Sequence, residues 1–194
     1  MTGIGDIPRS VVPVTTKAVL LVDGANIEIS AKERGLKSIN YGKLTEVILS
    51  ELKKVLHDED ITLIRPYYYD SYDGSQEKRS YLEKLENLGY DLQGVISQGH
   101  PEAGIQQQKC VDIKIAVDMV HFAHATPVEL IILCSGDMDF KPAVEIVKYT
   151  LKKVVIVSFK HSTSEDLMRK ADLFIDLTPM ISRLKSGGRR KKRK

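Results

Sequence analysis

The chain has 194 residues, of which 42% are hydrophobic and 28% are charged, the composition of an ordinary globular domain. At about 150 residues per domain, this length predicts one domain with short extensions. The apolar runs are far shorter than the ~20 residues of a membrane-spanning helix, and the N-terminus lacks the basic and apolar segments of a secretory signal. Cys110 and Cys134 are too few for a disulfide framework or a zinc site. We therefore expect a cytoplasmic protein with reduced cysteines and no membrane contact.

The formal net charge of +3 conceals an uneven distribution of charge along the chain. Removing the six basic residues of segment 189–194 from the total of 29 leaves 23 basic against 26 acidic residues, a net charge of −3. The sequence thus predicts a mildly acidic domain with a basic, disordered tail over residues 186–194. The basic residues of the tail are expected to bind phosphates, and the alternative is a solvated end without a partner. They are Arg189, Arg190, Lys191, Lys192, Arg193 and Lys194.

The hydrophobic pattern alternates between the periods of strands and of helices. Residues 1–16 contain two prolines and small polar residues, which predicts a flexible arm. In the first half of the chain we then expect a strand over 17–23, a helix capped by Asn40, a strand over 61–69, a helix stopped by Gly89 and a strand over 92–97. A polar loop over 99–109 precedes a helix that begins at Asp112. The second half continues with a strand over 129–134, a helix after Asp137, a strand over 154–159, a short helix capped by Ser164, a strand over 173–176 and a terminal helix from Thr178.

Strands that alternate with helices predict an α/β fold for residues 17–185. The strands would form a mostly parallel, doubly wound sheet with helices on both faces. In such sheets, ligands bind beyond the carboxyl ends of the strands, near the point where the strand order reverses. The polar residues that follow the strands are therefore the candidates for a functional site.

Acidic residues from three segments are predicted to lie at this edge of the sheet. Asp23 ends the first strand, Asp137 and Asp139 follow the strand over 129–134, and Asp112 begins a helix. Taken singly, Asp112 and Asp137 could be helix N-caps, Asp139 a first-turn acid, and Asp23 a turn residue. Together, four carboxylates in one crevice would repel one another unless a cation neutralised them. Oxygen ligands suit Mg²⁺ or Mn²⁺, and such ions promote phosphodiester hydrolysis.

Three motifs carry a resemblance to a known family: VDGANI at 22–27, QKCVDIKIAVDM at 108–119 and CSGDMDF at 134–140. Their order, spacing and strand context resemble those of the NYN domain family, the LabA-like members of the PIN-like nuclease group. The resemblance covers roughly residues 17–178. It implies a PIN-like fold and a metal-dependent ribonuclease that hydrolyses RNA phosphodiester bonds.

The resemblance also implies roles for individual residues. Asn26 would orient a phosphate or a water molecule of the metal ion, Lys109 would pair with a substrate phosphate, and Ser135 would hold a carboxylate or the backbone of its motif. Cys110 stands where many members have glycine, so the position of Lys109 is less secure than that of the acids. The predicted ligands of Mg²⁺ or Mn²⁺ are Asp23, Asp112, Asp137 and Asp139.

Other residues are interpreted as structural. Asp118 does not share a helical face with Asp112, and His121 and His124 are expected at the surface or in packing. Among Tyr67, Tyr68 and Tyr69, alternate side chains must face the core, while one or two could stack on an RNA base at the rim of the site.

Two alternatives to the ribonuclease remain. A non-catalytic RNA-binding or regulatory module could retain the same fold, although a complete acid set argues against it. A phosphatase on a similar sheet would need an aspartate two residues after Asp23, where this chain has Ala25. RNA is the expected partner, and the sequence leaves a homodimer open.

Overall fold

A computed structural model describes residues 15–58, 60–72, 75–96, 104–124 and 127–185. For residues 72, 94–96 and 104–109 it describes the backbone alone. The basic tail lies outside the described residues, as does the predicted arm apart from its last two residues. Of those two, Thr16 already belongs to the first strand. Among the described helices, none combines the length and the apolar character needed to cross a bilayer.

The secondary structure alternates between strands and helices, as the sequence predicts. The strands are β1 (Thr16–Asp23), β2 (Ile61–Tyr72), β3 (Asp91–Ile96), β4 (Leu130–Cys134), β5 (Lys153–Ser158) and β6 (Leu173–Asp176). The α-helices are α1 (Gly24–Glu33), α2 (Tyr41–Leu56), α3 (Gln76–Asn87), α4 (Gly104–His124), α5 (Lys141–Tyr149), α6 (Glu165–Lys170) and α7 (Ile181–Leu184). Short 3₁₀ turns are η2 (Met138–Phe140), η3 (Lys160–Ser162) and η4 (Thr178–Met180).

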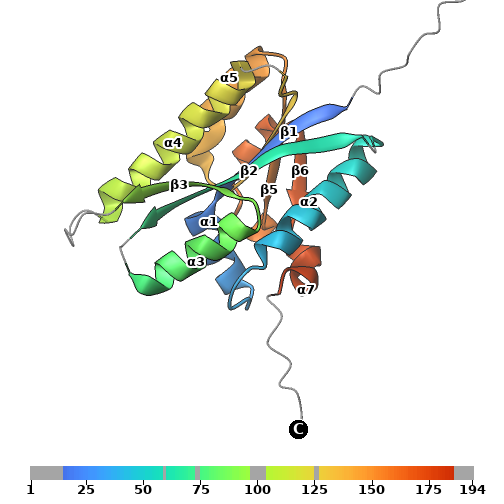
Figure 1. The fold of residues 1–194 in the computed structure, drawn as a ribbon. Coiled ribbons are helices and arrows are strands. Elements are labelled where there is room, and N and C mark those ends of the chain that lie inside the picture. Colours follow the sequence, from blue (N-terminus) through green and yellow to red (C-terminus); the bar gives the residue numbers. More distant parts are fainter. Residues whose placement is uncertain (1–14, 59, 73–74, 97–103, 125–126, 186–194) are drawn as a thin grey trace, which may run out of the picture.

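The six strands form one sheet in the order β3-β2-β1-β4-β5-β6. Every neighbouring pair in it is parallel. The chain first builds outward from β1 through β2 to β3, and then crosses back to add β4, β5 and β6 on the other side (Figure 1). This confirms the predicted doubly wound α/β sheet, and its strand order reverses between β1 and β4.

Helices cover both faces of the sheet because the central strands are apolar on both sides. On β1, Ala18, Leu20 and Val22 face a core formed with α1, α2, α3 and α7. Val19 and Leu21 face a second core formed with α4, α5 and α6. Figure 1 shows α4 and α5 on one side of the sheet and α2, α3 and α7 on the other.

Several predicted helix ends are confirmed by their capping contacts. The Asn40 side chain accepts a hydrogen bond from the Lys43 amide at 3.1 Å and begins α2. Ser164 begins α6. Gly89 follows α3 with a φ of +87°, the left-handed conformation in which glycine commonly ends helices.

Two expectations about helices are wrong. The chain enters α1 directly after Asp23, where the sequence analysis places no helix. In addition, α4 begins at Gly104, so residues 104–109 are helical rather than part of a loop, and Asp112 lies inside the helix instead of capping it. Both errors arise where turns of a helix are mainly polar, because apolar periodicity cannot reveal such turns.

The tyrosines that end β2 belong mainly to the two cores. Tyr68 and Tyr69 are buried in opposite cores, and the Tyr67 ring packs against Phe122 with a centroid distance of 4.8 Å. Their alternation is as predicted, and burial leaves the rings of Tyr68 and Tyr69 unable to stack on a base.

Candidate active site

The candidate site lies where the strand order reverses between β1 and β4. Val22 pairs with Cys134 at the carboxyl ends of these strands, so Asp23 and Ser135 leave the sheet side by side. Parallel sheets bind ligands at this point because the loops diverge there and leave a crevice. The structure therefore brings the first and third sequence motifs together.

Asp23 is held in place from both sides of this crevice. One carboxylate oxygen, Oδ1, accepts a hydrogen bond from the Asn26 amide at 3.1 Å and caps α1. The other, Oδ2, accepts a hydrogen bond from the Ser135 hydroxyl at 3.0 Å. Burial, with smaller contributions from the charges of Asp112 and Asp137, raises the pKa of Asp23 to about 6 despite these two hydrogen bonds.

A contact between Asn26 and Gly136 ties α1 to the loop after β4. The Gly136 amide donates to Oδ1 of Asn26 at 3.0 Å. A Cβ atom on Gly136 would lie 2.6 Å from the Ser162 carbonyl oxygen, so only glycine allows this close approach. The side-chain oxygen of Asn26 is thus engaged within the protein, whereas its amide nitrogen has no hydrogen-bond partner among the residues that the structure describes.

Three of the predicted acids line one small cavity of about 180 Å³, which we call the acid cavity. Asp23 comes from β1, Asp112 from α4 and Asp137 from the loop after β4. The remaining lining residues are Asn26, Ile29, Ser30, Glu33 and Ser162. Segments far apart in the sequence therefore deliver carboxylates to a space large enough for several water-sized groups.

The acids influence one another electrostatically. The pKa of Asp112 is raised by partial burial and then by the charges of Asp137 and Asp139. Asp139 itself is exposed and does not line the acid cavity. Asp137 accepts a hydrogen bond from the Asp139 amide at 3.0 Å and caps η2, so it combines the structural role of a cap with a place in the cavity.

The acids lie close together, but their side chains are not oriented to coordinate a metal ion. In the part of the chain that the structure describes, no group of three or more His, Cys, Asp or Glu side chains is arranged to hold an ion. Asp23 and Asp137 turn oxygens toward backbone amides and toward Ser135 instead.

The polar face of α1 was not predicted from the sequence. Asn26, Ser30 and Glu33 are spaced i, i+4 and i+7, the spacing of one helical face, and all line the acid cavity. That polar spacing after Asp23 is the signal that could have revealed both the helix and its role. Ser162, from η3, donates to the Ser30 hydroxyl at 2.8 Å and closes the cavity beside it.

Glu33 is supported by a hydrogen-bonded chain. Nδ1 of His161 lies 2.9 Å from Nε of Arg34. Since a guanidinium only donates, Nδ1 must accept, and the ring proton is on Nε2. That nitrogen then donates to the Glu33 carboxylate at 3.0 Å. The arrangement fixes Glu33 at the mouth of the acid cavity.

The other residues considered in the sequence lie elsewhere. The hydroxyl of Tyr69 donates to Asp118 at 2.9 Å, and Lys114 pairs with the same carboxylate, which confirms a structural contact. His121 and His124 are exposed. The side chain of Lys109 and all residues from Arg189 to Lys194 lie outside the described residues.

Comparison with known proteins identifies the family of the chain. The model of the NYN domain family matches residues 17–182. This chain belongs to the NYN domain family. Membership of the NYN family supports a nuclease or RNA-related function in general.

Two individual proteins are similar to this NYN domain. The low amplitude and bright protein LabA of Synechococcus elongatus is 28% identical over 127 residues, which cover 63% of this chain and 67% of that protein. The crystal structure of a protein of unknown function from Vibrio parahaemolyticus has a TM-score of 0.68 and 21% identity, covering 84% of this chain and 93% of that one. The second likeness supports the fold alone.

Proposed function

We propose that this protein is a metal-dependent ribonuclease that hydrolyses RNA phosphodiester bonds at the acid cavity. The observation that carries the proposal is the meeting of Asp23, Asp112 and Asp137, from three separate elements, at the reversal point of the sheet. A role as a helix cap or turn residue would explain each acid singly. Such roles would not explain why three carboxylates share one small cavity, where their charges repel one another.

The chemistry of the three carboxylates suits a hard divalent cation. Asp23, Asp112 and Asp137 offer only oxygen atoms as ligands, and Mg²⁺ and Mn²⁺ prefer oxygen ligands. The pKa values of Asp23 and Asp112 are raised by burial and by neighbouring negative charge. Both effects disfavour the ionised carboxylates, and a bound cation would stabilise the ionised forms. Asp23, Asp112 and Asp137 would hold the ion, while Asp139 would contribute its charge from the rim.

When bound, the ion would supply activation of water and neutralisation of the charge that develops on the phosphate. The protein's own residues position the reacting groups. Ser135 fixes the Asp23 carboxylate by its hydrogen bond, and the amide nitrogen of Asn26 is available to donate to a phosphate oxygen. We propose that Lys109 and the basic residues 189–194 contact phosphates farther along the RNA.

Incubation of the purified full-length chain with labelled RNA and DNA strands tests the proposal. We expect RNA to be cleaved with Mn²⁺ or Mg²⁺ and to remain intact with EDTA. RNA that is bound but never cleaved with either ion would contradict the proposal and favour the non-catalytic RNA-binding module. Equal cleavage in EDTA would contradict the role of the metal.

A further inference from the structure

A second cavity adjoins the acid cavity along α1. It has a volume of about 470 Å³, and its lining includes Glu28, Ile29, Tyr68, Asp70, Lys78 and Tyr81. We call it the tyrosine pocket. Ile29 lines both cavities, and Gly24, next to Asp23, also lines the tyrosine pocket. Its volume falls within the range of about 300–1,000 Å³ that is usual for pockets that bind small organic groups.

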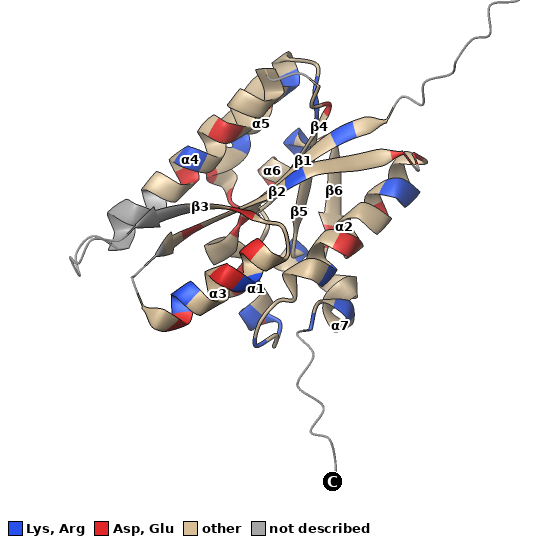
Figure 2. Ribbon diagram, in the orientation of Figure 1, with Lys and Arg blue, Asp and Glu red and all other residues tan. Residues whose placement is uncertain are grey.

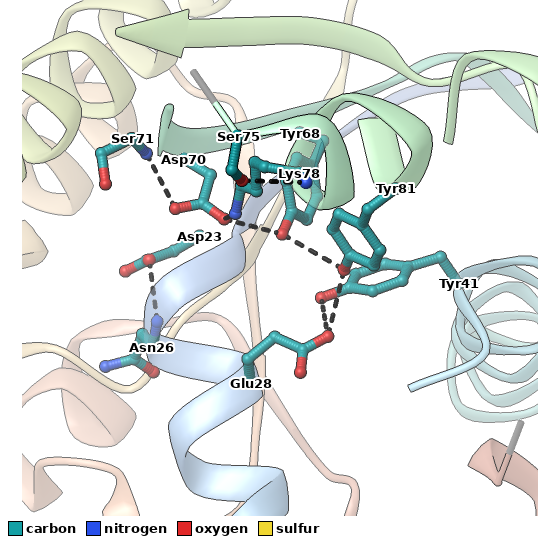
Figure 3. A network of polar contacts seen from close by, with 10 residues as sticks. All are labelled: Asp23, Asn26, Glu28, Tyr41, Tyr68, Asp70, Ser71, Ser75, Lys78 and Tyr81. Carbon is teal, nitrogen blue, oxygen red and sulfur yellow. Dashed lines mark hydrogen bonds and ion pairs between the residues drawn. The ribbon is translucent and has the colours of Figure 1, made fainter. Parts of the chain in front are cut away.

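Glu28 presents a partly satisfied carboxylate to this pocket (Figure 3). Hydroxyl groups of Tyr41 and Tyr81 both donate to its Oε1 atom, each at 3.1 Å. In the described part of the chain, Oε2 has no hydrogen-bond partner. The tyrosines therefore fix the carboxylate, and one oxygen is left to accept a hydrogen bond from a ligand.

The opposite wall combines a hydroxyl with an ion pair. Asp70 pairs with Lys78 and accepts a hydrogen bond from the Tyr68 hydroxyl at 3.1 Å. Tyr68 also abuts the start of α1, because a Cβ atom on Gly24 would lie 2.3 Å from its hydroxyl oxygen. This contact holds the wall against the residue that follows Asp23, and it places the pocket directly beside the acid cavity.

The charged side chains that line the tyrosine pocket determine which kind of ligand it favours. Glu28, Asp70 and Glu77 outnumber Lys32 and Lys78, and Lys78 is already paired with Asp70. A phosphate would therefore be disfavoured inside the tyrosine pocket. A sugar or base, which is uncharged and rich in hydroxyl and amino donors, would find carboxylate and tyrosine oxygens as acceptors.

We propose that the tyrosine pocket binds the nucleoside next to the phosphate at the acid cavity, and that Oε2 of Glu28 accepts a hydrogen bond from its ribose 2′-hydroxyl. The proposal rests on the proposed function, since it assumes an RNA phosphate in the acid cavity. It makes Glu28 a specificity residue. DNA lacks the 2′-hydroxyl, and a site built to bond a hydroxyl rejects an analogue without it because its own polar group stays unpaired.

Binding of a short fluorescein-labelled single-stranded RNA and of the DNA with the same sequence, measured by fluorescence anisotropy, tests this inference. Ca²⁺ replaces Mg²⁺ and Mn²⁺ in the buffer, so that an oxygen-binding cation still neutralises the acids of the acid cavity, and a gel of the same samples checks that the RNA stays intact. We expect the full-length protein to bind the RNA about tenfold or more tightly than the DNA, the effect of one hydrogen bond to a charged group. Glu28→Gln keeps an oxygen to accept from both tyrosines but replaces the free acceptor by a donor. It should lower RNA affinity about tenfold and leave DNA affinity within about twofold.

Glu46→Gln is the matched control, because Glu46 is an exposed acid of α2 that pairs with Lys43. It should leave the ratio of RNA to DNA affinity unchanged. If melting curves show that Glu28→Gln does not fold, Tyr81→Phe removes one of the hydroxyls that fix Glu28 and should reduce the same ratio. Equal affinity of the wild type for RNA and DNA, or an equal loss for both in Glu28→Gln, would overturn the proposal.

The outcome separates this inference from the proposed function. Metal-dependent RNA cleavage with no effect of Glu28→Gln on the affinity ratio would refute the role of the pocket and leave the ribonuclease standing. A preference for RNA that Glu28→Gln abolishes, in a protein that cleaves nothing with Mn²⁺ or Mg²⁺, would support the pocket and refute the ribonuclease.

Discussion

Asp23 is the residue at which contacts from β1, α1 and the loop after β4 converge. Its hydrogen bonds to the Asn26 amide and the Ser135 hydroxyl hold the carboxylate in position, but burial still favours its neutral form and raises its pKa to about 6. Such a residue opposes folding once it is ionised. The sequence could indicate Asp23 from its place at a strand end, whereas its burial follows from packing that the sequence does not display.

Asp23→Asn should therefore stabilise the metal-free protein at neutral pH. The folded-state pKa of about 6 exceeds the ordinary value of 3.8. The folded state therefore binds more protons between these values, and the free energy of unfolding of the wild type falls as pH rises through them. The free energy of unfolding of the variant, relative to that of the wild type, should therefore rise by up to about 3 kcal/mol as the pH rises from about 4 to about 7. Urea unfolding in EDTA measures this gain, with Asp60→Asn as an exposed control. A difference that does not change with pH would contradict the prediction.

Gly136 marks a second position where a single atom matters. A Cβ atom there would meet the backbone oxygen of Ser162 at 2.6 Å, whereas a Cβ atom on Gly42 would make contacts of 3.4 Å. Gly136→Ala should lower the free energy of unfolding by about 1–3 kcal/mol, because the loop and η3 must separate. Gly42→Ala should leave it nearly unchanged. Equal unfolding midpoints for the two variants in urea would argue against the close approach.

At the scale of elements, apolar patterns predicted the strands and the amphipathic helices well. They failed at α1 and at the first turns of α4, where polar side chains predominate. The reason is physical: α1 turns Asn26, Ser30 and Glu33 toward the acid cavity, and the only apolar side chains that this helix buries are those of Ile27 and Ala31. The sequence motifs predicted which acids share an edge of the sheet. They did not show that Asp139 lies outside the cavity or that Glu33 lines it.

The contribution of α4 to the metal site can be tested through thermal stability. An ion that binds the folded state alone stabilises it by about 3 kcal/mol at a hundred times its dissociation constant. Mn²⁺ should therefore raise the melting temperature of the wild type, and Asp112→Asn should reduce this rise by at least half. Asp118→Asn, on the same helix but outside the cavity, should keep the rise. An Mn²⁺ effect that is absent in the wild type or unchanged in Asp112→Asn would exclude Asp112 as a ligand.

At the scale of the whole molecule, the charges of the domain are mixed. Figure 2 shows acidic and basic residues interspersed along α2 and α3, and several form ion pairs such as Lys43 with Glu46 and Lys54 with Glu51. Such a surface offers no continuous basic track for a nucleic acid along these helices. The net charge of the domain without residues 189–194 is −3. We therefore propose that these six basic residues supply the sequence-independent phosphate binding.

Replacement of residues 189–194 by glutamine should weaken RNA binding most at low salt. Each phosphate contact on a single strand contributes about −0.7 to the slope of log affinity against log salt, so loss of six charges should flatten the slope by up to about 4. Binding isotherms at several salt concentrations measure it. The single-turnover cleavage rate at saturating RNA should stay nearly unchanged, because the acids lie on other elements. An unchanged slope would show that the tail does not bind RNA.

The central claim is that Asp23, Asp112 and Asp137 together hold a catalytic metal ion in the acid cavity. It is tested most directly by the single-turnover rate of RNA cleavage in Mn²⁺ for the wild type, Asp137→Asn and the exposed control Asp60→Asn. We predict that Asp137→Asn lowers this rate about a hundredfold or more, the scale on which loss of one charge-stabilising group acts. Asp60→Asn should match the wild type. A folded Asp137→Asn protein that cleaves RNA at the wild-type rate would contradict the claim.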